Sequence, residues 1–351
     1  MFLLREVHHD DLDALEELAR HLNTLNLPAD RAQLEKIIEV SQASFSERIE
    51  DIKEREYVFV LCDEEADRII GTAMIIAQHG TYRRPSVYFN VRKEQKYSET
   101  LNKYFVHQVL QLNFNYEGPT EIGGLILHPD SQGHPQRLGK LLSFVRFLFI
   151  GVHRDWFREA IIAELLPPLN ADGTSDLWDC LGANFTGLDY TTADKLSREN
   201  VEFIRSLFPQ TPIYTSLLPE RVRSMIGQVG APTKPVEKML KSIGFQYENS
   251  IDPFDGGPTF GVPTDQCELI KRTHRSSFAG LLLDDEQADG QALVGHEHAH
   301  DSVRFRAVLA DYKQVENGYL LRSPGLHSLL LEQDAIIALL VLSGPGMASL
   351  Y

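Results

Sequence analysis

The sequence has 351 residues, of which 43% are hydrophobic and 24% are charged, a composition typical of ordinary globular proteins and not of disordered chains. Its net charge of −16 argues against nucleic acid as a partner, because binding to phosphates needs a basic face. No apolar run approaches the roughly 20 residues of a membrane span, no secretory signal is recognisable, and the 3 cysteines are too far apart for a disulfide framework, so we expect a cytoplasmic protein without a membrane partner.

Two amphipathic helices are predicted near the N-terminus. Apolar residues recur with a period near 3.6 from Leu12 to Leu22, and Asp10 or Asp11 is the expected N-cap. Asp30 is the expected N-cap of the second helix.

The pattern then changes to that of strands. Two apolar runs, 57–62 and 69–76, are joined by an acidic turn and predict a β-hairpin. A further strand is predicted over 86–92, where large apolar residues alternate with polar ones.

The segment 121–142 predicts a strand, a polar loop and a helix in succession. The apolar strand over 121–128 is ended by a Pro-Asp pair, and the helix is expected to begin at Arg137. A buried strand over 160–165 follows.

The rest of the chain is predicted to be helical first and then rich in strands. Residues 174–243 are mostly helical, and their last helix is expected to stop at Gly244. Strands are predicted over 303–310, 318–322 and 336–342.

The strand, loop and helix over 121–142 suit the pyrophosphate of an acyl-CoA. Backbone N–H groups and the dipole at a helix N-terminus attract phosphate, and a pantetheine arm can pair with a strand edge. Arg137 and Lys140 add cations, while Gly133, Leu138 and Gly139 complete the loop and the first turn. The same pattern also occurs as a purely structural crossover, so the motif by itself leaves both interpretations open.

The order of these elements resembles the GNAT N-acetyltransferase superfamily, and the segment 236–245 resembles its late helix followed by a Gly-Phe pair. This resemblance implies an α+β, GNAT-like N-acyltransferase fold, a mixed twisted sheet with helices on both faces, in duplicate and with a small C-terminal β unit. We expect a first GNAT-like unit with the CoA site over 1–150, a second, helix-rich GNAT-like unit over 151–262, and a β-rich domain over 263–351.

Several blocks resemble one family more closely, the bacterial arginine N-succinyltransferases. In chain order they are residues 24–30, 57–60, 125–130, 141–147, 163–164, 178–182, 212–214, 226–229 and 255–259. The resemblance implies transfer of succinyl from succinyl-CoA to the α-amine of L-arginine, in arginine degradation, with no permanently bound cofactor. It also places Leu125 at the CoA site, and we include Leu127 on the same strand.

The sequence departs from the family's pattern at two functional positions. Gly230 stands where the family carries a histidine that is regarded as the proton donor, and Arg137 stands where the first glycine of the helix turn falls. Because amine acylation needs a base and an acid, Glu121 and Glu164 are the candidates to replace that histidine. Both lie on predicted apolar strands, where burial would raise a carboxyl pKa, and a structural ion pair is the competing explanation for Glu164.

Further charged residues match the two proposed substrates. Carboxylates that could bind the cationic amine are Asp189 and Asp255, with Asp194 and Asp252 in neighbouring blocks. The free carboxylate of a succinyl group requires a cation. Arg146 and Arg154, which follow the start of the CoA helix, are candidates for that cation as well as for packing or surface roles.

Three histidines, His296, His298 and His300, alternate in a short tract. On a strand they would share one face, as metal ligands do, but no cysteine or carboxylate stands at partner spacing. We interpret the tract as a solvated loop and expect no metal site.

Three functions remain open on the sequence. The first is an arginine N-succinyltransferase, and the second is a GNAT-like acyltransferase for another amine or acyl-CoA. The third is a non-catalytic CoA-binding partner subunit, which Gly230 favours. In each case the ligand is an acyl-CoA, the enzymes also need a cationic amine, and homo- and hetero-oligomers are both compatible with the chain.

Overall fold

A computed structural model describes residues 1–22, 28–197, 200–298, 302–347 and 349–350, and the chain forms two compact units. Unit 1 consists of residues 1–77, 120–159 and 264–351, and unit 2 of residues 78–119 and 160–263. The units are interleaved in sequence, because the chain leaves unit 1 twice and returns to it. This grouping differs from three consecutive domains, and the division at 150 and 262 stays a prediction.

Unit 1 is built on a sheet whose strands run in the order β12-β15-β11-β14-β13-β1-β2-β3-β6. These strands are β1 Phe2–Glu6, β2 Glu56–Asp63, β3 Arg68–Ile76, β6 Thr120–Leu127, β11 Thr273–Leu281, β12 Gly290–Glu297, β13 Phe305–Val315, β14 Gly318–Arg322 and β15 Ile336–Ser343. Strands β11 and β14 pair in parallel, whereas pairs such as β2 and β3 are antiparallel, so the predicted mixed sheet is confirmed. Because β12 pairs with both β15 and β13, the five late strands close into a ring, and β1 joins that ring to β2.

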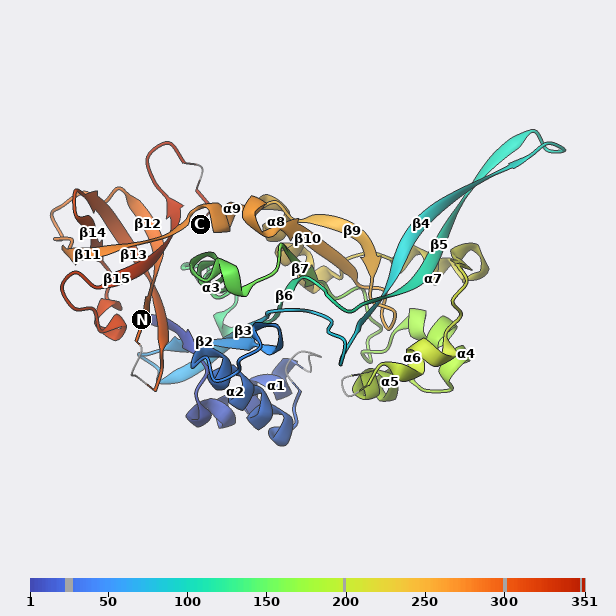
Figure 1. The fold of residues 1–351 in the computed structure, drawn as a ribbon, viewed down its shortest axis with the longest axis horizontal. Helices are drawn as coiled ribbons and strands as arrows, with labels where there is room; N and C mark the ends of the chain where they lie inside the picture. The colour runs from blue at the N-terminus through green and yellow to red at the C-terminus, as the bar shows by residue number, and fades with distance from the viewer. Residues whose placement is uncertain (23–27, 198–199, 299–301, 348, 351) are drawn as a thin grey trace. The chain divides into compact units, whose positions relative to one another are not determined.

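Helices cover both faces of the β2–β3 sheet in unit 1 (Figure 1). They are α1 Leu12–Leu22, α2 Arg31–Phe45, α3 Leu138–Val152 and the short α9 Glu268–Lys271. Leu15, Leu18 and Leu34 of α1 and α2 pack with Val58 and Val60 of β2. The alternate residues Tyr57 and Phe59 contact Phe149 of α3 with ring centroids 4.8 and 5.5 Å apart. The period of two along β2 therefore separates the two helical layers.

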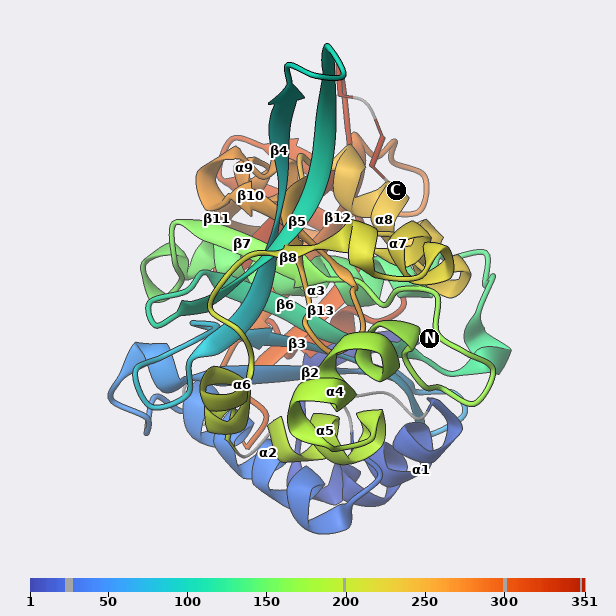
Figure 2. The same cartoon turned by 90° about the vertical axis from the view of Figure 1, so that its right-hand side faces the viewer.

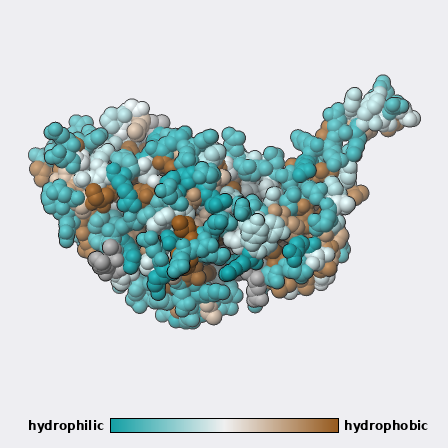
Figure 3. All heavy atoms as spheres, viewed as in Figure 1, coloured by the Kyte–Doolittle hydropathy of each residue, from teal (hydrophilic) through white to brown (hydrophobic). Residues whose placement is uncertain are grey.

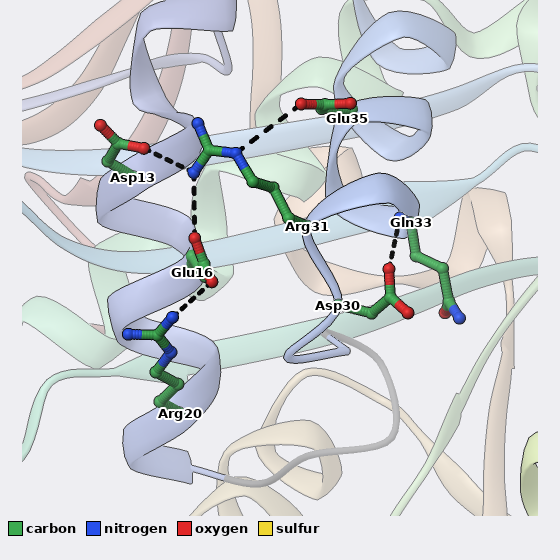
Figure 4. Close-up of polar contacts among 7 residues, drawn as sticks. All are labelled: Asp13, Glu16, Arg20, Asp30, Arg31, Gln33 and Glu35. Carbon is green, nitrogen blue, oxygen red and sulfur yellow. Dashed lines mark hydrogen bonds and ion pairs between the residues drawn. The ribbon is translucent and has the colours of Figure 1, made fainter.

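Polar contacts fasten α1 to α2 (Figure 4). Arg31 donates to Asp13 at 2.7 Å and to Glu16 at 3.0 Å. Asp30 accepts a hydrogen bond from the Gln33 N–H at 3.1 Å, as predicted for an N-cap. The resembling block at 24–30 lies partly outside the described residues, which omit 23–27.

Unit 2 has the strand order β7-β10-β9-β4-β5-β8, in which each strand pairs antiparallel with its neighbours. The strands are β4 Ser86–Ser98, β5 Lys103–Asn115, β7 Ala160–Glu164, β8 Ile213–Tyr214, β9 Gln246–Ile251 and β10 Pro258–Pro263. The helices are α4 Ala183–Thr186, α5 Tyr190–Ser197, α6 Glu202–Leu207, α7 Glu220–Met225 and α8 Lys234–Ser242. Trp178, in a π-helical turn, stacks on Phe254 with centroids 4.8 Å apart and anchors the helices to the sheet. Figures 1 and 2 both show β4 and β5 extending beyond the rest of unit 2 as a long ribbon.

Most predicted elements are confirmed, including both N-terminal helices, the 57–76 hairpin, β6, α3, β7 and α8. The predicted cap of α1 is wrong. His8 caps a short turn before α1, accepting from the Asp10 N–H at 3.4 Å, and Asp11 accepts from the His8 N–H at 2.7 Å. Strands β5, β11 and β12 were not predicted. The duplication of the GNAT-like unit stays a prediction.

The surface of the protein is largely hydrophilic on the face that is drawn in Figure 3. On the face drawn in Figure 3, hydrophilic residues predominate and hydrophobic ones form small separate groups. Within the described residues, no helix has the length and apolarity needed to span a bilayer.

Candidate active site

Strand β6 contains a β-bulge at the residues predicted to meet an acyl-CoA. Opposite β3, Thr72 faces Ile126 and Met74 faces Gly123, so a single β3 residue lies opposite both Gly124 and Leu125. Gly124 adopts φ +54°, and a side chain there would come within 2.8 Å of Met74. A bulge of this kind leaves one residue outside the ladder and turns its backbone groups away from the neighbouring strand. Leu125 is therefore placed at an interruption of the sheet.

The loop after β6 ends at an arginine in a conformation that favours glycine. Arg137 is the N-cap of α3 with φ 47° and ψ 48°, and its side chain is exposed. A left-handed backbone costs a residue with a Cβ roughly 1–2 kcal/mol. Gly133 also has a positive φ of +71°, with nothing near the position of a Cβ. Arg137 therefore has a backbone conformation that glycine adopts readily, and it adds a guanidinium at this position of the loop.

The first turn of α3 offers backbone donors to an anion. The N–H groups of Leu138 and Gly139 have no carbonyl one turn earlier to bond within the helix, whereas the Lys140 N–H donates to the Arg137 carbonyl at 2.8 Å. The helix dipole adds positive potential. The Leu138 side chain is buried, so this residue can offer a ligand only its backbone. A Cβ at Gly139 would meet the Leu127 side chain at 3.8 Å, an ordinary contact. Lys140 is half-buried, and its Nζ donates to the Leu350 carbonyl at 3.2 Å.

The two candidate catalytic glutamates have different environments. Glu121 is buried at the beginning of β6, opposite Ile76. Glu164 is the last residue of β7, opposite Thr259 of β10, and it is exposed. The expectation that Glu164 is buried was wrong, because Ile161 and Ala163 occupy the inward face of β7 and the alternation puts Glu164 on the other.

The turn between β9 and β10 carries the buried Asp255 and the half-buried Asp252. Asp252 Oδ1 accepts from the N–H groups of Phe254 at 2.6 Å and Asp255 at 3.1 Å, and Asp255 Oδ1 accepts from the Gly257 N–H at 2.7 Å. Burial, together with the charge of Glu164, raises the pKa of Asp252 to about 7. Burial and the charge of Asp252 raise the pKa of Asp255 well above its usual range.

Asp194 adds to this set, because its charge also raises the pKa of both aspartates in the turn. Unit 2 therefore brings Glu164, Asp194, Asp252 and Asp255 close enough to repel one another, and a positively charged ligand would relieve that repulsion.

Asp189 has a different role in the fold. It precedes α5 and accepts from the Thr192 N–H at 2.9 Å and from the Thr192 hydroxyl at 2.8 Å. The N–H and hydroxyl of Thr192 lower the pKa of Asp189. Its side chain is exposed and acts as a helix cap, and it is not among the charges that shift the acidic turn.

The position of the family's histidine is closed to a side chain. The Gly230 N–H donates to the Leu166 carbonyl at 2.8 Å, which holds the two backbones together. A Cβ on Gly230 would lie 2.6 Å from the Pro167 carbonyl oxygen. Any larger residue here requires the 166–167 segment to move.

The histidine tract is only partly a loop. His296 belongs to β12, its Nδ1 lies 2.9 Å from His298 Nε2, and both nitrogens lie within 3.0 Å of the Leu329 carbonyl oxygen. The interpretation of the whole tract as a solvated loop was therefore wrong for His296, and His300 lies outside the described residues. Among the residues with described positions, no group of three His, Cys, Asp or Glu side chains could hold a metal ion.

Comparison with known proteins gives the family. A family model described as "Arginine N-succinyltransferase beta subunit" matches residues 2–269. The chain belongs to this family. The family resemblance noticed in the sequence is thereby confirmed, and with it an N-acyltransferase enzyme class.

Similarity extends beyond the family match along nearly the whole chain. A protein named arginine N-succinyltransferase from Escherichia coli is 32% identical over 335 residues, 94% of each chain. One from Citrobacter koseri is 32% identical over 315 residues, 88% of each chain. The solved structure titled arginine/ornithine succinyltransferase subunit AI from Pseudomonas aeruginosa matches with a TM-score of 0.82 at 26% identity, covering 98% of this chain and 99% of that one.

The prediction that Leu125 lies on a strand is confirmed, but the β-bulge at this residue was missed. The bulge and the positive φ of Gly124 were not predicted, although two successive glycines within an apolar strand, 123–124, are a signal for one. The proximity of Glu164 to Asp252 and Asp255 was also missed. Glu164 is far from these two residues in sequence and comes close to them through the pairing of β7 with β10.

Proposed function

We propose that the protein is an arginine N-succinyltransferase, which transfers the succinyl group of succinyl-CoA to the α-amine of L-arginine. The observation that carries the proposal is 32% identity over 94% of both chains to a protein of that name. Each unit by itself adds support from chemistry, because unit 1 offers donors for an anion and unit 2 has a set of carboxylates for a cation. The acyl-CoA is a co-substrate and not a bound cofactor.

The CoA part of the proposal involves β6 and α3. The pyrophosphate would be bound by the loop residue Gly133, by Arg137, and by the first turn of α3 at Leu138, Gly139 and Lys140. The pantetheine arm and thioester would run along β6 at Leu125 and Leu127, where the bulge leaves backbone groups outside the ladder. This arrangement fits a GNAT-like N-acyltransferase.

The amine part involves the acidic turn of unit 2. Asp255 and Asp252 would attract the guanidinium or the α-ammonium of arginine, because burial and neighbouring negative charges raise the pKa of both carboxyls and a nearby cation would favour their charged forms. Asp189 is the weaker substrate candidate, since both of its carboxylate oxygens already accept from Thr192.

The chemistry needs a free amine, a polarised carbonyl and a proton for the leaving thiolate. The amine nitrogen attacks the thioester carbon, the C–S bond breaks, and the ammonium proton passes to a base. An N–H group freed by the β6 bulge is suited to stabilise the developing oxyanion. A carboxylate whose pKa burial raises to about 7, as at Asp252, is suited to accept the proton near neutral pH. Glu121 and Glu164 remain proposed participants in proton transfer.

Thiol release from a panel of acyl-CoAs and amines tests the function directly. We expect release with succinyl-CoA plus L-arginine, and much less when either is replaced. Release only with a different pair would support an acyltransferase of other specificity. The absence of release with every pair would contradict the enzyme proposal.

One observation favours a second candidate, a CoA-binding partner subunit without catalytic activity. Gly230 replaces the family's histidine, and the close approach of Pro167 leaves no room for a side chain there. The words "beta subunit" and "subunit AI" in the names of similar proteins describe chains of assemblies. A thermal shift with CoA in the absence of any thiol release would support this candidate.

A further inference from the structure

Helix α3 buries a guanidinium that has no counter-charge. Arg146 is only 2% exposed, although it sits in the middle of an otherwise apolar helix. Burial lowers the pKa of Arg146 to about 9, and no charged neighbour offsets that shift. Within the part of the chain that the structure describes, no carboxylate forms an ion pair with it. Burying an unpaired cation is costly, so an isolated arginine at such a position calls for an explanation.

The hydrogen bonds of Arg146 orient it without neutralising it. Nε donates to the Ser143 carbonyl at 3.1 Å, one terminal nitrogen donates to the Ser143 hydroxyl at 2.7 Å, and the other to the Gly123 carbonyl at 3.1 Å. All three acceptors are uncharged. They use three of the five N–H groups of a guanidinium, which leaves donors for a further acceptor.

The position of this guanidinium relates it to the acyl donor. Gly123 is the residue immediately before the β6 bulge, and Gly124 and Leu125 form the bulge itself. The proposed function assigns that part of β6 to the thioester end of the acyl-CoA. A cation bonded to the Gly123 carbonyl therefore lies beside the strand segment where the acyl group would be.

The other candidate arginine is already neutralised. Arg154 donates from Nε to Asp265 at 2.7 Å and from a terminal nitrogen to Glu159 at 2.8 Å, near the surface. Its ion pairs account for its charge, so of the two arginines only Arg146 has a charge still to be matched.

We propose that Arg146 binds the free carboxylate of the acyl group, and so selects a dicarboxylic acyl-CoA over a neutral one. The inference rests on the proposed function, because it assumes that the acyl donor lies along β6. A bidentate or charge-assisted contact would convert the unpaired buried cation into a buried ion pair. A neutral acyl chain would leave the cation unpaired and would bind less well.

Succinyl-CoA and butyryl-CoA are suitable probes, because their acyl chains have the same number of carbons and only one ends in a carboxylate. We expect Arg146→Gln to lower kcat/KM for succinyl-CoA by roughly 10²-fold, and to leave kcat/KM for butyryl-CoA nearly unchanged. Arg146→Lys keeps the charge and should restore part of the preference. Arg154→Gln is the matched control and should keep the succinyl-to-butyryl ratio of the wild type.

A purely structural role of Arg146 would give a different result. Both rates would then fall together, the ratio would stay constant in Arg146→Gln and Arg146→Lys, and the proposal would be overturned. If the glutamine variant does not fold, the ratio in the lysine variant decides.

Failure of the proposed function can be recognised separately. If the wild type releases no thiol with any acyl-CoA, calorimetric binding of the same two probes replaces kinetics. Tighter binding of succinyl-CoA that disappears in Arg146→Gln supports the role of Arg146, and equal binding of both probes by the wild type contradicts it.

Discussion

The β6–α3 segment of unit 1 carries the cationic side chains of Arg137, Lys140 and Arg146, whereas the β9–β10 turn of unit 2 carries Asp252 and Asp255. The two regions have local charges of opposite sign, although the chain as a whole has a net charge of −16. In unit 1 a helix N-terminus and a few cations create a local site for an anion despite the acidic chain. In unit 2 burial and mutual repulsion raise the pKa of the carboxyls, and a bound cation would relieve that repulsion. The comparison shows that net charge says little about a site whose potential is set by its nearest groups.

The largest effect is expected from a substitution in the acidic β9–β10 turn of unit 2. Asp255→Asn keeps an oxygen to accept from the Gly257 N–H but removes a buried negative charge. We expect kcat/KM for L-arginine to fall roughly 10²-fold, because a buried charge partner is lost, while CoA affinity stays unchanged. Steady-state kinetics with varied arginine and calorimetry with CoA measure the two effects.

Asp189→Asn is the matched control for that variant. Since Asp189 already caps α5, its loss should lower stability and change kcat/KM for arginine only slightly. A larger kinetic effect at Asp189 than at Asp255 would reverse our assignment of the amine site.

The second prediction concerns the closed position in unit 2. Gly230→His should not improve thiol release and should lower the free energy of unfolding by roughly 1–3 kcal/mol, because its Cβ would collide with the Pro167 carbonyl. Urea denaturation measures the loss. Gly139→Ala is the control, because its Cβ would make only an ordinary contact and alanine favours a helix. A Gly230→His variant that is stable and releases thiol faster would contradict this prediction, because it would show that the position can accommodate a histidine.

The third prediction concerns how the stability of the protein depends on pH through Asp252. The pKa of Asp252 is raised in the folded protein to about 7, above its value of about 3.9 in an unfolded chain. An acid with a raised folded pKa stabilises the fold below the unfolded pKa, and this contribution is lost as pH rises through the folded pKa. The wild type should therefore lose roughly 1–3 kcal/mol between pH 4 and 8 from this turn.

Asp252→Asn should remove that loss, so its midpoint of denaturation should exceed that of the wild type at pH 8 but not at pH 4. Asp172→Asn is the control, because hydrogen bonds from Thr174 lower the pKa of this exposed carboxyl, and its removal should act in the opposite direction. Identical pH profiles for wild type and Asp252→Asn would contradict the burial of a charged turn.

The smallest expected effect concerns Arg137 in unit 1. Arg137→Gly should raise the free energy of unfolding by about 1 kcal/mol, because glycine accepts the left-handed backbone. It should also weaken CoA binding several-fold, and less so at high salt, because a cation near phosphate is lost. Denaturation and calorimetry would show the two quantities changing in opposite directions.

Glu47→Gly provides a matched control for Arg137. Glu47 is exposed and has a φ of 56°, so glycine should stabilise it similarly without affecting CoA. If Arg137→Gly binds CoA as well as the wild type, the arginine has no part in binding the pyrophosphate.

Local patterns determined much of the fold from the sequence alone. The period of 3.6 in α1 and the apolar runs of β2 and β3 predicted those elements, because burial of one face depends on residue spacing. Strand β5 was not predicted, and its first residues, including the apolar Tyr104, Phe105 and Val106, are exposed, so burial of one face does not set its pattern there. Its pairing with β4 along 13 residues, and not its own hydrophobic pattern, makes it a strand.

The sequence also determined the family, because this depends on contiguous blocks such as 125–130 and 141–147, and the same blocks led to the proposed CoA site. Only the tertiary structure decided that Glu164 is exposed, that Gly230 has no space for a side chain, and that Arg146 is a buried cation bonded to Gly123. Each of these depends on segments brought together by strand pairing or by packing of α3 on β6. Burial and charge compensation are properties of such neighbourhoods, and spacing along the chain does not specify them.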